Sequence, residues 1–427
     1  MILKGQPGAA AQVEEHLDEL AQLADSAGSR VVGRAVQARQ APDAATFIGK
    51  GKAAEIGAAA AALGADLLLF DDDLTAGQAK ALEEATSLAV LDRSGLILEI
   101  FDQRAKSREA RTQVELARLN YLLPRLTRRW SHLSRQAGGV GTRGGEGEKQ
   151  LEQDRRVLRA RIRHLEQDLV RIERTRGLQR HGRRGVPVVA LTGYTNAGKS
   201  TLFNRLTAAD ALAENRLFAT LDAKLRRGAL PAAGAAGGNG AVFADTVGFI
   251  RKLPHHLVSS FRSTLGEITA ADLVLHVVDR SHPQWHDQMR VADEVLDELG
   301  VVRRRVVTVF NKCDRVAAGS PPLPWEGGAG GDRVTLRVSA LTGEGIDALR
   351  SEIARRLPAL AAGLVAAPSA PSDDRAGSPA GPLAVPAEAI PWRPLADAAA
   401  EDATVAAPEA AAAAAPLARA AGAGSRA

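Results

Sequence analysis

The pattern of hydrophobic and polar positions divides the 427-residue chain into four stretches of different character. In residues 1–103, short apolar runs alternate with segments whose apolar residues recur at helical spacing. Helices are predicted at Val13–Ala24, Ala53–Leu63 and Ala76–Ala85, and strands at Val31–Val36, Asp66–Phe70 and Leu88–Leu91. Strands that alternate with helices are typical of a parallel sheet, so the sequence predicts a small N-terminal α/β subdomain.

Residues 104–184 show a heptad pattern instead. Apolar residues recur at spacings of seven, four, three, four and three along Leu151, Leu158, Ile162, Leu165, Leu169 and Ile172. This stripe predicts a long helix that pairs with a second helix. The second helix is expected in the leucine-rich segment 116–126, and Pro124 should kink or end it. Between the two, Trp130–Lys149 is rich in glycine, so we predict a helical hairpin with a long, flexible tip.

From residue 185 to 358 the alternating pattern returns and predicts a second α/β unit. Apolar strand runs are found at Val188–Leu191, Ala241–Ala244, Leu273–Val278, Val306–Phe310 and Val334–Val338. The last stretch, 359–427, is dominated by alanine and interrupted by prolines. Such a composition buries too little apolar surface to fold, so a disordered tail is predicted. The fold class expected for the folded part of the chain is α/β.

The clearest chemical signal is a glycine-rich loop between the first of these strands and the helix that follows. It reads Gly193-Tyr-Thr-Asn-Ala-Gly198-Lys199-Ser200-Thr201, the pattern of a phosphate-binding loop. Glycines let backbone N–H groups surround phosphates, and a helix N-terminus favours negative charge. We expect Lys199 to reach the β- and γ-phosphates and the Ser200 hydroxyl to bind Mg²⁺. The residues predicted to contact the nucleotide here are Gly193, Asn196, Ala197, Gly198, Lys199, Ser200 and Thr201.

Two later motifs supply the expected metal and γ-phosphate contacts. Asp245 opens Asp245-Thr-Val-Gly248 at a predicted strand end, where its carboxylate can hold Mg²⁺ through water and the Gly248 N–H can sense the γ-phosphate. Thr220 lies between the phosphate loop and Asp245, where a switch threonine closes on Mg²⁺. The expected metal-binding residues are Ser200, Thr220 and Asp245. The expected catalytic residues are Lys199, Thr220 and Gly248.

Base selection is expected at two other strand ends. Asn311-Lys312-Cys313-Asp314 follows the apolar run that ends at residue 310. The Asp314 carboxylate can accept hydrogen bonds from N1–H and the 2-amino group of guanine, a pair of donors that adenine lacks. Ser339-Ala340 follows the last strand and can support guanine O6 through a backbone N–H. Because these motifs follow the phosphate loop in the order typical of a guanine-nucleotide site, we predict GTP as substrate and Mg²⁺ as cofactor.

Phe249 directly follows Gly248, at the position where Ras-type GTPases carry a glutamine that orients the attacking water. Its side chain cannot make a conventional hydrogen bond, so slow intrinsic hydrolysis is predicted, with acceleration by a partner that reorders the switches or contributes a group. The alternative is that Phe249 packs inward and another residue positions the water. Asn196 adds a second hypothesis, because some phosphate loops with asparagine here bind K⁺.

Charge is concentrated in the predicted hairpin. The whole chain has a formal net charge of +5, but residues 104–184 carry 22 Lys and Arg against 9 Asp and Glu, a net charge of +13, which leaves −8 for the rest. Arginine, glycine and an aromatic ring at the tip suit an irregular RNA surface. The residues predicted to bind RNA are Arg125, Arg128, Arg129, Trp130, Arg135 and Arg143. The alternative interpretation is a solvated coiled-coil face.

Cysteine content and apolar runs indicate the compartment. A single cysteine, Cys313, excludes a disulfide framework and fits a reducing environment. The N-terminal residues lack the apolar stretch of a secretory signal, and no apolar run is long enough to span a membrane. A cytoplasmic protein without a membrane partner is therefore expected.

Five short motifs outside the nucleotide site are specific enough to indicate a family. They are Phe47-Ile-Gly-Lys-Gly-Lys52, Gln113-Val-Glu-Leu116, Tyr121-Leu-Leu-Pro-Arg-Leu126, His132-Leu-Ser-Arg-Gln136 and Gly138-Gly-Val-Gly-Thr-Arg143. With the nucleotide motifs, they resemble the HflX-type translational GTPases, in which Phe249 is also the normal residue. The chain departs from the family at Glu146 and Lys149, because family members often have Gly-Pro-Gly-Glu-Thr in this segment. It also departs in the tail, where some members carry a further folded domain.

The resemblance implies binding to the large ribosomal subunit and its RNA, with the hairpin tip reaching toward the peptidyl-transferase region. It also implies ribosome-stimulated hydrolysis and a role in splitting or rescuing stalled ribosomes under stress. We expect a monomer that binds GTP and GDP, in which GTP orders the switches and favours the ribosome-bound state. Three alternatives remain open: a ribosome-assembly GTPase, a GTP-gated RNA-remodelling module, and a regulatory scaffold that acts through protein contacts.

Overall fold

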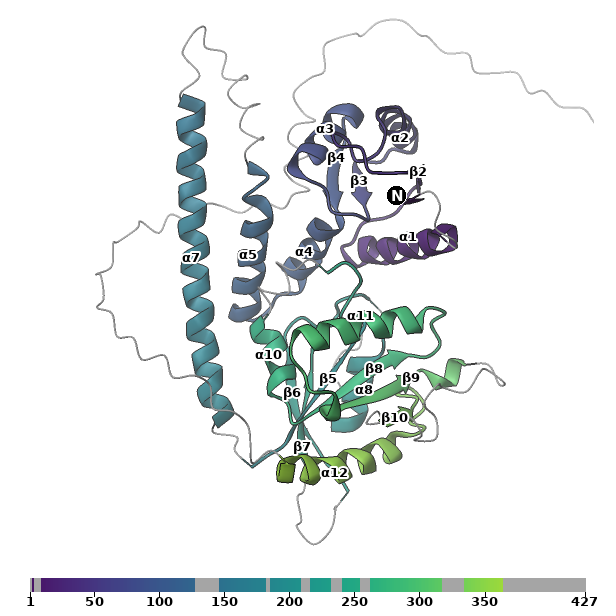
Figure 1. Ribbon diagram of the computed structural model, residues 1–427, viewed down its shortest axis with the longest axis vertical. Helices are drawn as coiled ribbons and strands as arrows, with labels where there is room; N and C mark the ends of the chain where they lie inside the picture. Colours follow the sequence, from purple (N-terminus) through teal and green to yellow (C-terminus); the bar gives the residue numbers. More distant parts are fainter. Residues whose placement is uncertain are drawn as a thin grey trace, which may run out of the picture. The chain divides into compact units, whose positions relative to one another are not determined.

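The computed structural model describes residues 2–3, 9–126, 146–181, 185–208, 216–231, 240–253, 262–316 and 334–363 (Figure 1). All of them belong to one compact unit, residues 1–368. Most of the predicted hairpin tip, 127–145, and most of the predicted tail, 364–427, lie outside these ranges. Within the described part of the chain, no helix combines the length and the apolar character that crossing a membrane requires.

The N-terminal part consists of short parallel strand pairs and helices. The strand pairs are β1 (Ile2–Leu3) with β2 (Ala38–Arg39) and β3 (Leu67–Phe70) with β4 (Ala89–Asp92). The helices are α1 (Ala9–Ser26), α2 (Lys50–Leu63), α3 (Ala76–Thr86) and α4 (Arg93–Arg104). Helix α3 begins at a capping box, in which the side chains of Thr75 and Gln78 each accept a hydrogen bond from the other residue's backbone N–H. The predicted α/β class is confirmed.

Several N-terminal elements differ from the sequence-based expectation, which lacks the two-residue strands β1 and β2. The strand predicted at Val31–Val36 is wrong, because no described strand pairs with this segment and both Val31 and Val32 stay exposed. Helix α4 is missing from the prediction, since eight of its twelve residues, on all sides of the helix, are buried. A helix buried all round lacks the amphipathic period by which helices are recognised.

The two long helices pack along the predicted apolar stripe. Helices α5 (Arg108–Leu122) and α7 (Glu146–His181) meet at Leu116, Ile162 and Leu165, which are buried. Helix α5 ends just before Pro124, as predicted. Helix α7 begins at Glu146, however, so the irregular tip does not extend to Lys149. Glutamate, lysine and glutamine in this segment are strong helix formers, which explains the earlier start.

Residues 188–363 contain a six-stranded sheet. Its order is β10-β9-β8-β5-β7-β6, and each neighbouring pair is parallel except β6 with β7. The strands are β5 (Val188–Gly193), β6 (Lys224–Gly228), β7 (Ala241–Asp245), β8 (Leu273–Asp279), β9 (Val306–Asn311) and β10 (Val334–Arg337). The helices are α8 (Lys199–Thr207), α10 (Arg262–Ala270), α11 (Trp285–Glu298) and α12 (Ile346–Gly363), with 3₁₀ turns η1 (Arg303–Arg305) and η2 (Cys313–Arg315).

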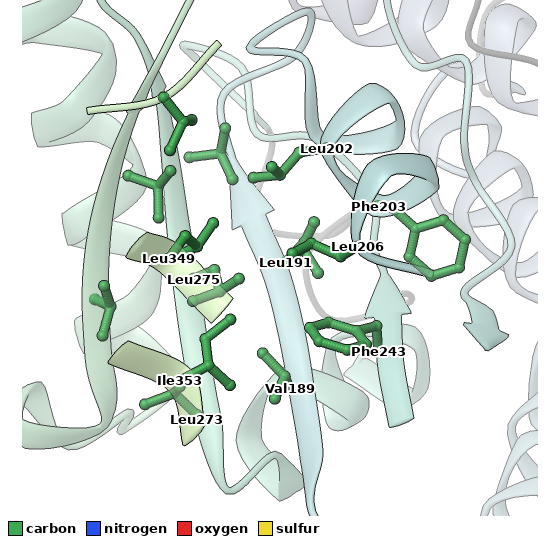
Figure 2. Close-up of a cluster of buried hydrophobic side chains, with 14 of the residues drawn as sticks. Val189, Leu191, Leu202, Phe203, Leu206, Phe243, Leu273, Leu275, Leu349 and Ile353 are labelled. Atoms are coloured by element: carbon green, nitrogen blue, oxygen red, sulfur yellow. The ribbon is translucent and has the colours of Figure 1, made fainter. Parts of the chain in front are cut away.

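Helices cover both faces of this sheet. On one face, Phe203 of α8 and Leu349 of α12 pack with Leu191 and its neighbours (Figure 2). On the other face, α10 and α11 pack against Ala190 and Val274. Since successive residues of a strand point to opposite faces, burial on both sides makes the strands read as continuous apolar runs. This is why the sequence predicts them well.

In this part of the chain, the sequence analysis does not predict one strand of the sheet and places the end of the last helix too early. Strand β6 is an edge strand, and its sequence, Lys-Leu-Arg-Arg-Gly, has one large apolar residue and two exposed arginines. Charged side chains at a sheet edge discourage pairing with other chains. Helix α12 continues to Gly363, past residue 358 where the tail is expected to begin.

One hydrophobic cluster combines residues of the N-terminal helices with residues of the part that contains the six-stranded sheet. Leu20, Ile97 and Phe101 belong to α1 and α4, and they pack with Phe218 and Ile250. Phe218 and Phe101 meet edge to face, with ring centroids 4.8 Å apart. The segments around Thr220 and after Gly248 therefore lie against the N-terminal helices.

Candidate functional site

A pocket opens where β5, β7 and β9 end. In α/β sheets ligands bind at the carboxyl ends of the strands, because the loops there surround a common space. Eleven predicted residues line this pocket: Asn196, Gly198, Lys199, Ser200, Thr201, Thr220, Gly248, Asn311, Lys312, Asp314 and Ala340. The other four each form a hydrogen bond with a lining residue; they are Gly193, Ala197, Asp245 and Ser339. The structure thus brings all the predicted nucleotide-site residues together.

The phosphate loop is shaped by residues with positive φ. The angle is 140° at Gly193, 60° at Asn196 and 89° at Gly198. A Cβ atom on Gly193 would lie 2.1 Å from the Val277 carbonyl oxygen, and one on Gly198 would lie 2.3 Å from Asn311 Nδ2. Neither position tolerates a side chain. Gly198 is also the N-cap of α8, so the pocket lies at a helix N-terminus, which favours anions.

Lys199 is buried at the floor of the pocket. Its Nζ donates hydrogen bonds to the carbonyl oxygens of Tyr194 at 2.7 Å and Gly193 at 3.2 Å. Burial lowers the pKa of Lys199 to about 8, although the Asp245 carboxylate acts to raise it. An ammonium group with so little solvation is suited to binding phosphate oxygens.

Nucleotide affinity should fall as the pH rises through 8. Phosphate oxygens favour the charged ammonium and raise the pKa of Lys199, so binding takes up a proton wherever the free lysine is neutral. Affinity for GDP at pH 8.5 is expected to be about a third of that at pH 7.5, with little change between pH 6.5 and 7.5. Calorimetry in buffers of different ionisation enthalpy measures affinity and proton uptake together. A pH-independent affinity would contradict the assignment of Lys199 to the phosphates.

Three oxygen atoms converge beside Lys199. Ser200 Oγ lies 2.7 Å from Asp245 Oδ2 and 3.1 Å from Thr220 Oγ1, and Thr220 Oγ1 lies 3.1 Å from Asp245 Oδ2. Asp245 Oδ1 is buried without a hydrogen-bond partner among the described residues. Burial raises the pKa of Asp245, which Ser200 and Lys199 act to lower. A cation bound here would compensate for this desolvated carboxylate.

This donor set fits Mg²⁺ bound together with phosphates. Mg²⁺ usually takes one or two protein ligands and completes its shell with water and phosphate oxygens. The described residues contain no group of three or more His, Cys, Asp or Glu that could hold a metal ion. At Gly248 a Cβ atom would lie 2.8 Å from Lys199 Nζ, so only glycine leaves room beside this cluster for a γ-phosphate.

The base end of the pocket is a rigid hydrogen-bonded frame. Asn311 Nδ2 donates to the Ala197 carbonyl oxygen at 2.9 Å, and Asn311 Oδ1 accepts from the Ala340 N–H at 3.0 Å. Ser339 Oγ donates to Asp314 Oδ1 at 2.6 Å. The loop after β9, the phosphate loop and the loop after β10 are therefore held together by side chains that the sequence assigns to guanine recognition. This geometry orients the Asp314 carboxylate for a base with two adjacent donors.

Several other residues that line the pocket are not predicted from the sequence. They are Thr195, Arg216, Phe218, Ala219, Thr246, Arg315 and Leu341. Thr195 and Thr246 lie within the motifs already recognised, and Phe218 and Ala219 lie next to Thr220. Arg216, Arg315 and Leu341 belong to no motif, so only the folded chain places them at the pocket.

Comparison with known proteins decides the family. Consecutive parts of the chain match the families described as GTP-binding GTPase N-terminal (residues 14–102), GTP-binding GTPase Middle Region (104–183) and 50S ribosome-binding GTPase (188–312). The GTPase HflX of Magnetococcus marinus is 48% identical over 341 residues, which cover 79% of this chain and 77% of that protein. The chain belongs to the HflX family of GTPases. It is accordingly a GTPase with the P-loop fold.

A second curated relative agrees with this assignment. The GTPase HflX of Chlamydia pneumoniae is 47% identical over 345 residues, covering 79% of this chain and 71% of that protein. A solved structure of a GTP-binding protein from Sulfolobus solfataricus, in complex with GDP, is a more distant likeness. It has 24% identity and a TM-score of 0.41, and it covers 82% of this chain and 97% of that chain.

Phe249 packs inward in this HflX-family chain. Its side chain is 1% exposed and lies in the core between the sheet and helices α10 and α11. Its backbone N–H donates to the Gly193 carbonyl oxygen at 3.0 Å, and its own carbonyl oxygen accepts from the Thr195 N–H at 2.7 Å. Phe249 thus links the phosphate loop to the segment after Gly248, and its inward packing is the one that the alternative interpretation expects.

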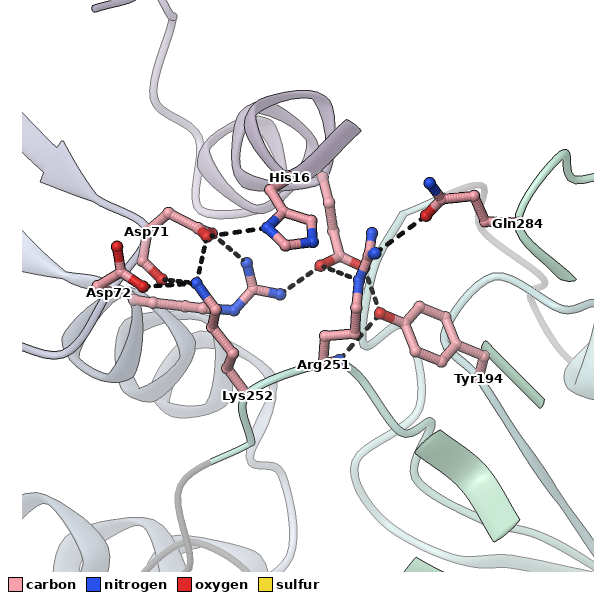
Figure 3. A network of polar contacts seen from close by, with 9 residues as sticks. His16, Asp71, Asp72, Tyr194, Arg251, Lys252 and Gln284 are labelled. Carbon is pink, nitrogen blue, oxygen red and sulfur yellow. Dashed lines mark hydrogen bonds and ion pairs between the residues drawn. The ribbon is translucent and has the colours of Figure 1, made fainter. Parts of the chain in front are cut away.

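Tyr194 connects the phosphate loop to α1 (Figure 3). Its hydroxyl donates to Glu19 and accepts from the backbone N–H of Arg251 at 2.9 Å. Burial and the nearby Glu19 carboxylate raise the pKa of Tyr194, so the hydroxyl keeps its proton. One side chain thereby joins the phosphate loop, the segment after Gly248 and the N-terminal part of the molecule.

Lys252 extends this network to Asp71 and Asp72, which follow β3 (Figure 3). Arg93 belongs to the same network. Lys252 Nζ lies 2.7 Å from carboxylate oxygens of both Asp71 and Asp72. The Arg93 guanidinium, which is 2% exposed, pairs with Asp71 at 2.6 Å and also with Glu19. Burial acts to lower the pKa of Lys252, but the two aspartates outweigh it and raise the pKa. A movement of the segment after Gly248 has to break these ion pairs or carry them along.

The predicted RNA-binding residues fall into two groups. Arg125 makes an ion pair with Asp92, donates to the Leu74 carbonyl oxygen at 2.8 Å and lies over the Tyr121 ring at 3.6 Å. These contacts hold the end of α5 on the N-terminal part, so we leave Arg125 out of the proposed RNA surface. The others lie outside the described residues; they are Arg128, Arg129, Trp130, Arg135 and Arg143.

Proposed function

We propose that this chain hydrolyses GTP on the large ribosomal subunit and there splits or rescues stalled ribosomes. The observation that carries the proposal is the attachment of a complete guanine-nucleotide pocket to a helical hairpin with a net charge of +13. The match to the family described as 50S ribosome-binding GTPase supports it. In this proposal the N-terminal part (1–103) and the hairpin (104–184) dock on ribosomal RNA, and residues 185–358 bind and hydrolyse GTP.

The described residues provide each step of nucleotide recognition. Asp314 selects guanine, and Lys199 holds the phosphates. Bound Mg²⁺, with Ser200 and Thr220 as ligands, would neutralise charge that develops on the phosphates. Thr220 and the Gly248 N–H meet the γ-phosphate side of the site, so their position distinguishes GTP from GDP. We place this activity in the cytoplasm and assign it to a monomer.

Hydrolysis by the isolated protein should be slow, and large subunits should accelerate it about 100-fold or more. Phe249 is buried, as the alternative interpretation also expects. The proposal is that no other residue of the isolated protein positions the water, so a partner has to order the switches or contribute a group. Single-turnover hydrolysis of radiolabelled GTP, with and without purified large subunits, measures both rates. Fast turnover by the protein alone would contradict this prediction.

Asn196 should make the rate depend on the monovalent cation. The residue lines the pocket with φ of 60°, where its side-chain oxygen can bind K⁺ beside the phosphates. Replacing K⁺ by Na⁺ at constant ionic strength is expected to lower the rate about tenfold, the equivalent of one charged contact. Asn196→Gly keeps the backbone conformation and should abolish the difference. Equal rates in the two salts for the unaltered chain would remove K⁺ from the proposal.

Cosedimentation with purified ribosomal subunits tests the proposal as a whole. The full chain is expected to pellet with the large subunit in the presence of a non-hydrolysable GTP analogue and to remain in the supernatant with GDP. No nucleotide-dependent association would overturn the proposal. Preference for precursor subunits would favour ribosome assembly, and equal affinity for naked RNA would favour an RNA-remodelling module.

A further inference from the structure

Asp222, two residues after Thr220, connects the nucleotide site with the hairpin. Its Oδ2 accepts hydrogen bonds from the backbone N–H groups of Lys106 at 3.2 Å and Ser107 at 3.1 Å. Its Oδ1 accepts from the Ser107 hydroxyl. One carboxylate thus receives three donors from the turn that precedes α5, a part of the chain more than 100 residues away.

Ser107 directly precedes α5. It is the N-cap of the helix, and its Oγ accepts a hydrogen bond from the Ala110 N–H at 3.0 Å. A helix N-terminus has unpaired N–H groups and favours negative charge. Asp222 supplies that charge from a different segment, so the start of α5 and the position of Asp222 depend on each other.

Hydrophobic packing also holds the chain on both sides of Thr220. Phe218 and Leu221 are both buried, in the cluster that contains Phe101 and Ala110 of α4 and α5. With Phe218 in this core before Thr220, and Asp222 bound to the turn before α5 after it, the intervening backbone directs the Thr220 hydroxyl toward Ser200 and Asp245. The anchors on either side of Thr220 therefore include α4, α5 and the turn before α5, in addition to residues next to the phosphate loop.

We propose that Asp222 is a positioning residue for GTP, which keeps Thr220 at the metal through its contact with the start of α5. The inference rests on the proposed role of Thr220 as an Mg²⁺ ligand that is engaged in the GTP state. It predicts that Asp222 contributes to the affinity for GTP and not to that for GDP. Since coupling between two sites is reciprocal, a ligand that holds α5 in place also favours GTP.

The test compares Asp222→Ala, Ser107→Ala and the double variant with the unaltered full-length chain. Affinities for fluorescent GDP and for a fluorescent, non-hydrolysable GTP analogue are measured over a series of Mg²⁺ concentrations. Asp222→Ala is expected to weaken the analogue about tenfold, to leave GDP within about twofold, and to raise the Mg²⁺ concentration that analogue binding requires. The preference for the analogue over GDP should fall no further in the double variant than in Asp222→Ala, because the hydrogen bond between Ser107 Oγ and Asp222 is already lost there; loss of the Ser107 N-cap should affect both nucleotides alike.

Glu298→Ala, at an exposed position of α11, is the matched control and should change none of these values. If the unaltered chain shows no Mg²⁺-dependent preference for the analogue, the proposed role of Thr220 fails and not the Asp222 contact alone. If that preference exists and Asp222→Ala weakens GDP and the analogue equally, the contact is merely structural and the inference is overturned. Ser107→Ala retains both backbone hydrogen bonds and is expected to show a smaller loss in the same direction, even if Asp222→Ala folds poorly.

Discussion

Asp314→Asn should lower GTP affinity by about 100- to 10,000-fold, because two charge-assisted hydrogen bonds to guanine are lost. The asparagine side chain can still accept the hydrogen bond from Ser339 Oγ, so the loop keeps its frame. The NH₂ group of the asparagine then faces the N1–H and 2-amino donors of guanine. Because this NH₂ group is itself a donor, it cannot accept a hydrogen bond from either of them. Xanthine carries a carbonyl oxygen in place of the 2-amino group and accepts from this NH₂, so the variant should bind xanthosine triphosphate more tightly than GTP.

Competition of both nucleotides against a fluorescent analogue measures the change in preference. Asp347→Asn, on the exposed side of α12, is the matched control and should leave both affinities unchanged. A GTP affinity within about threefold of the unaltered chain would show that Asp314 does not contact the base. Weak binding of both nucleotides would instead indicate that the loop after β9 has lost its structure.

Arg93→Met is expected to cost about 3–5 kcal/mol of unfolding free energy, the usual effect of removing one partner from a buried ion pair. The variant keeps the apolar length of the side chain but leaves the Glu19 and Asp71 carboxylates without their shared guanidinium. Lys252 stays beside Asp71, and Tyr194 still donates to Glu19. Those partners compensate in part, so the lower end of the range is expected.

Urea denaturation followed by circular dichroism, with and without GDP, measures the loss of unfolding free energy. Arg290→Met is the matched control, since Arg290 makes exposed ion pairs with Asp287 and Glu294 that contribute less than about 1 kcal/mol. Equal losses in the two variants would show that the buried network is worth no more than a surface pair.

The nucleotide site could be predicted from the sequence because each part of it is local. The phosphate loop needs glycine at Gly193 and Gly198 for its backbone angles, and these positions are close together in the chain. The parallel strands bring the remaining motifs to the same edge, which is a general property of such sheets. Arg216 carries no such signal, because its position at the pocket depends on how the segment before Thr220 packs.

The network around Glu19 could not be predicted, for a related reason. Glu19, Asp71, Arg93 and Arg251 come from four segments, and each alone reads as an ordinary charged surface residue. Only tertiary packing desolvates them and makes their pairing necessary. Arg125 shows the same limit, since its charge predicts RNA binding while the fold pairs it with Asp92.

The hydrophobic cluster that joins Leu20 and Ile97 to Phe218 and Ile250 has an evolutionary consequence. If the nucleotide-binding part were attached to an unrelated N-terminus, these apolar side chains would be exposed to water. Each would then lose roughly 1.5–3 kcal/mol of stabilisation by burial. Substitutions on one side of this core have to be matched on the other. Recombination that exchanged the N-terminal part alone would separate side chains that pack on each other, so it is expected to destabilise the chain.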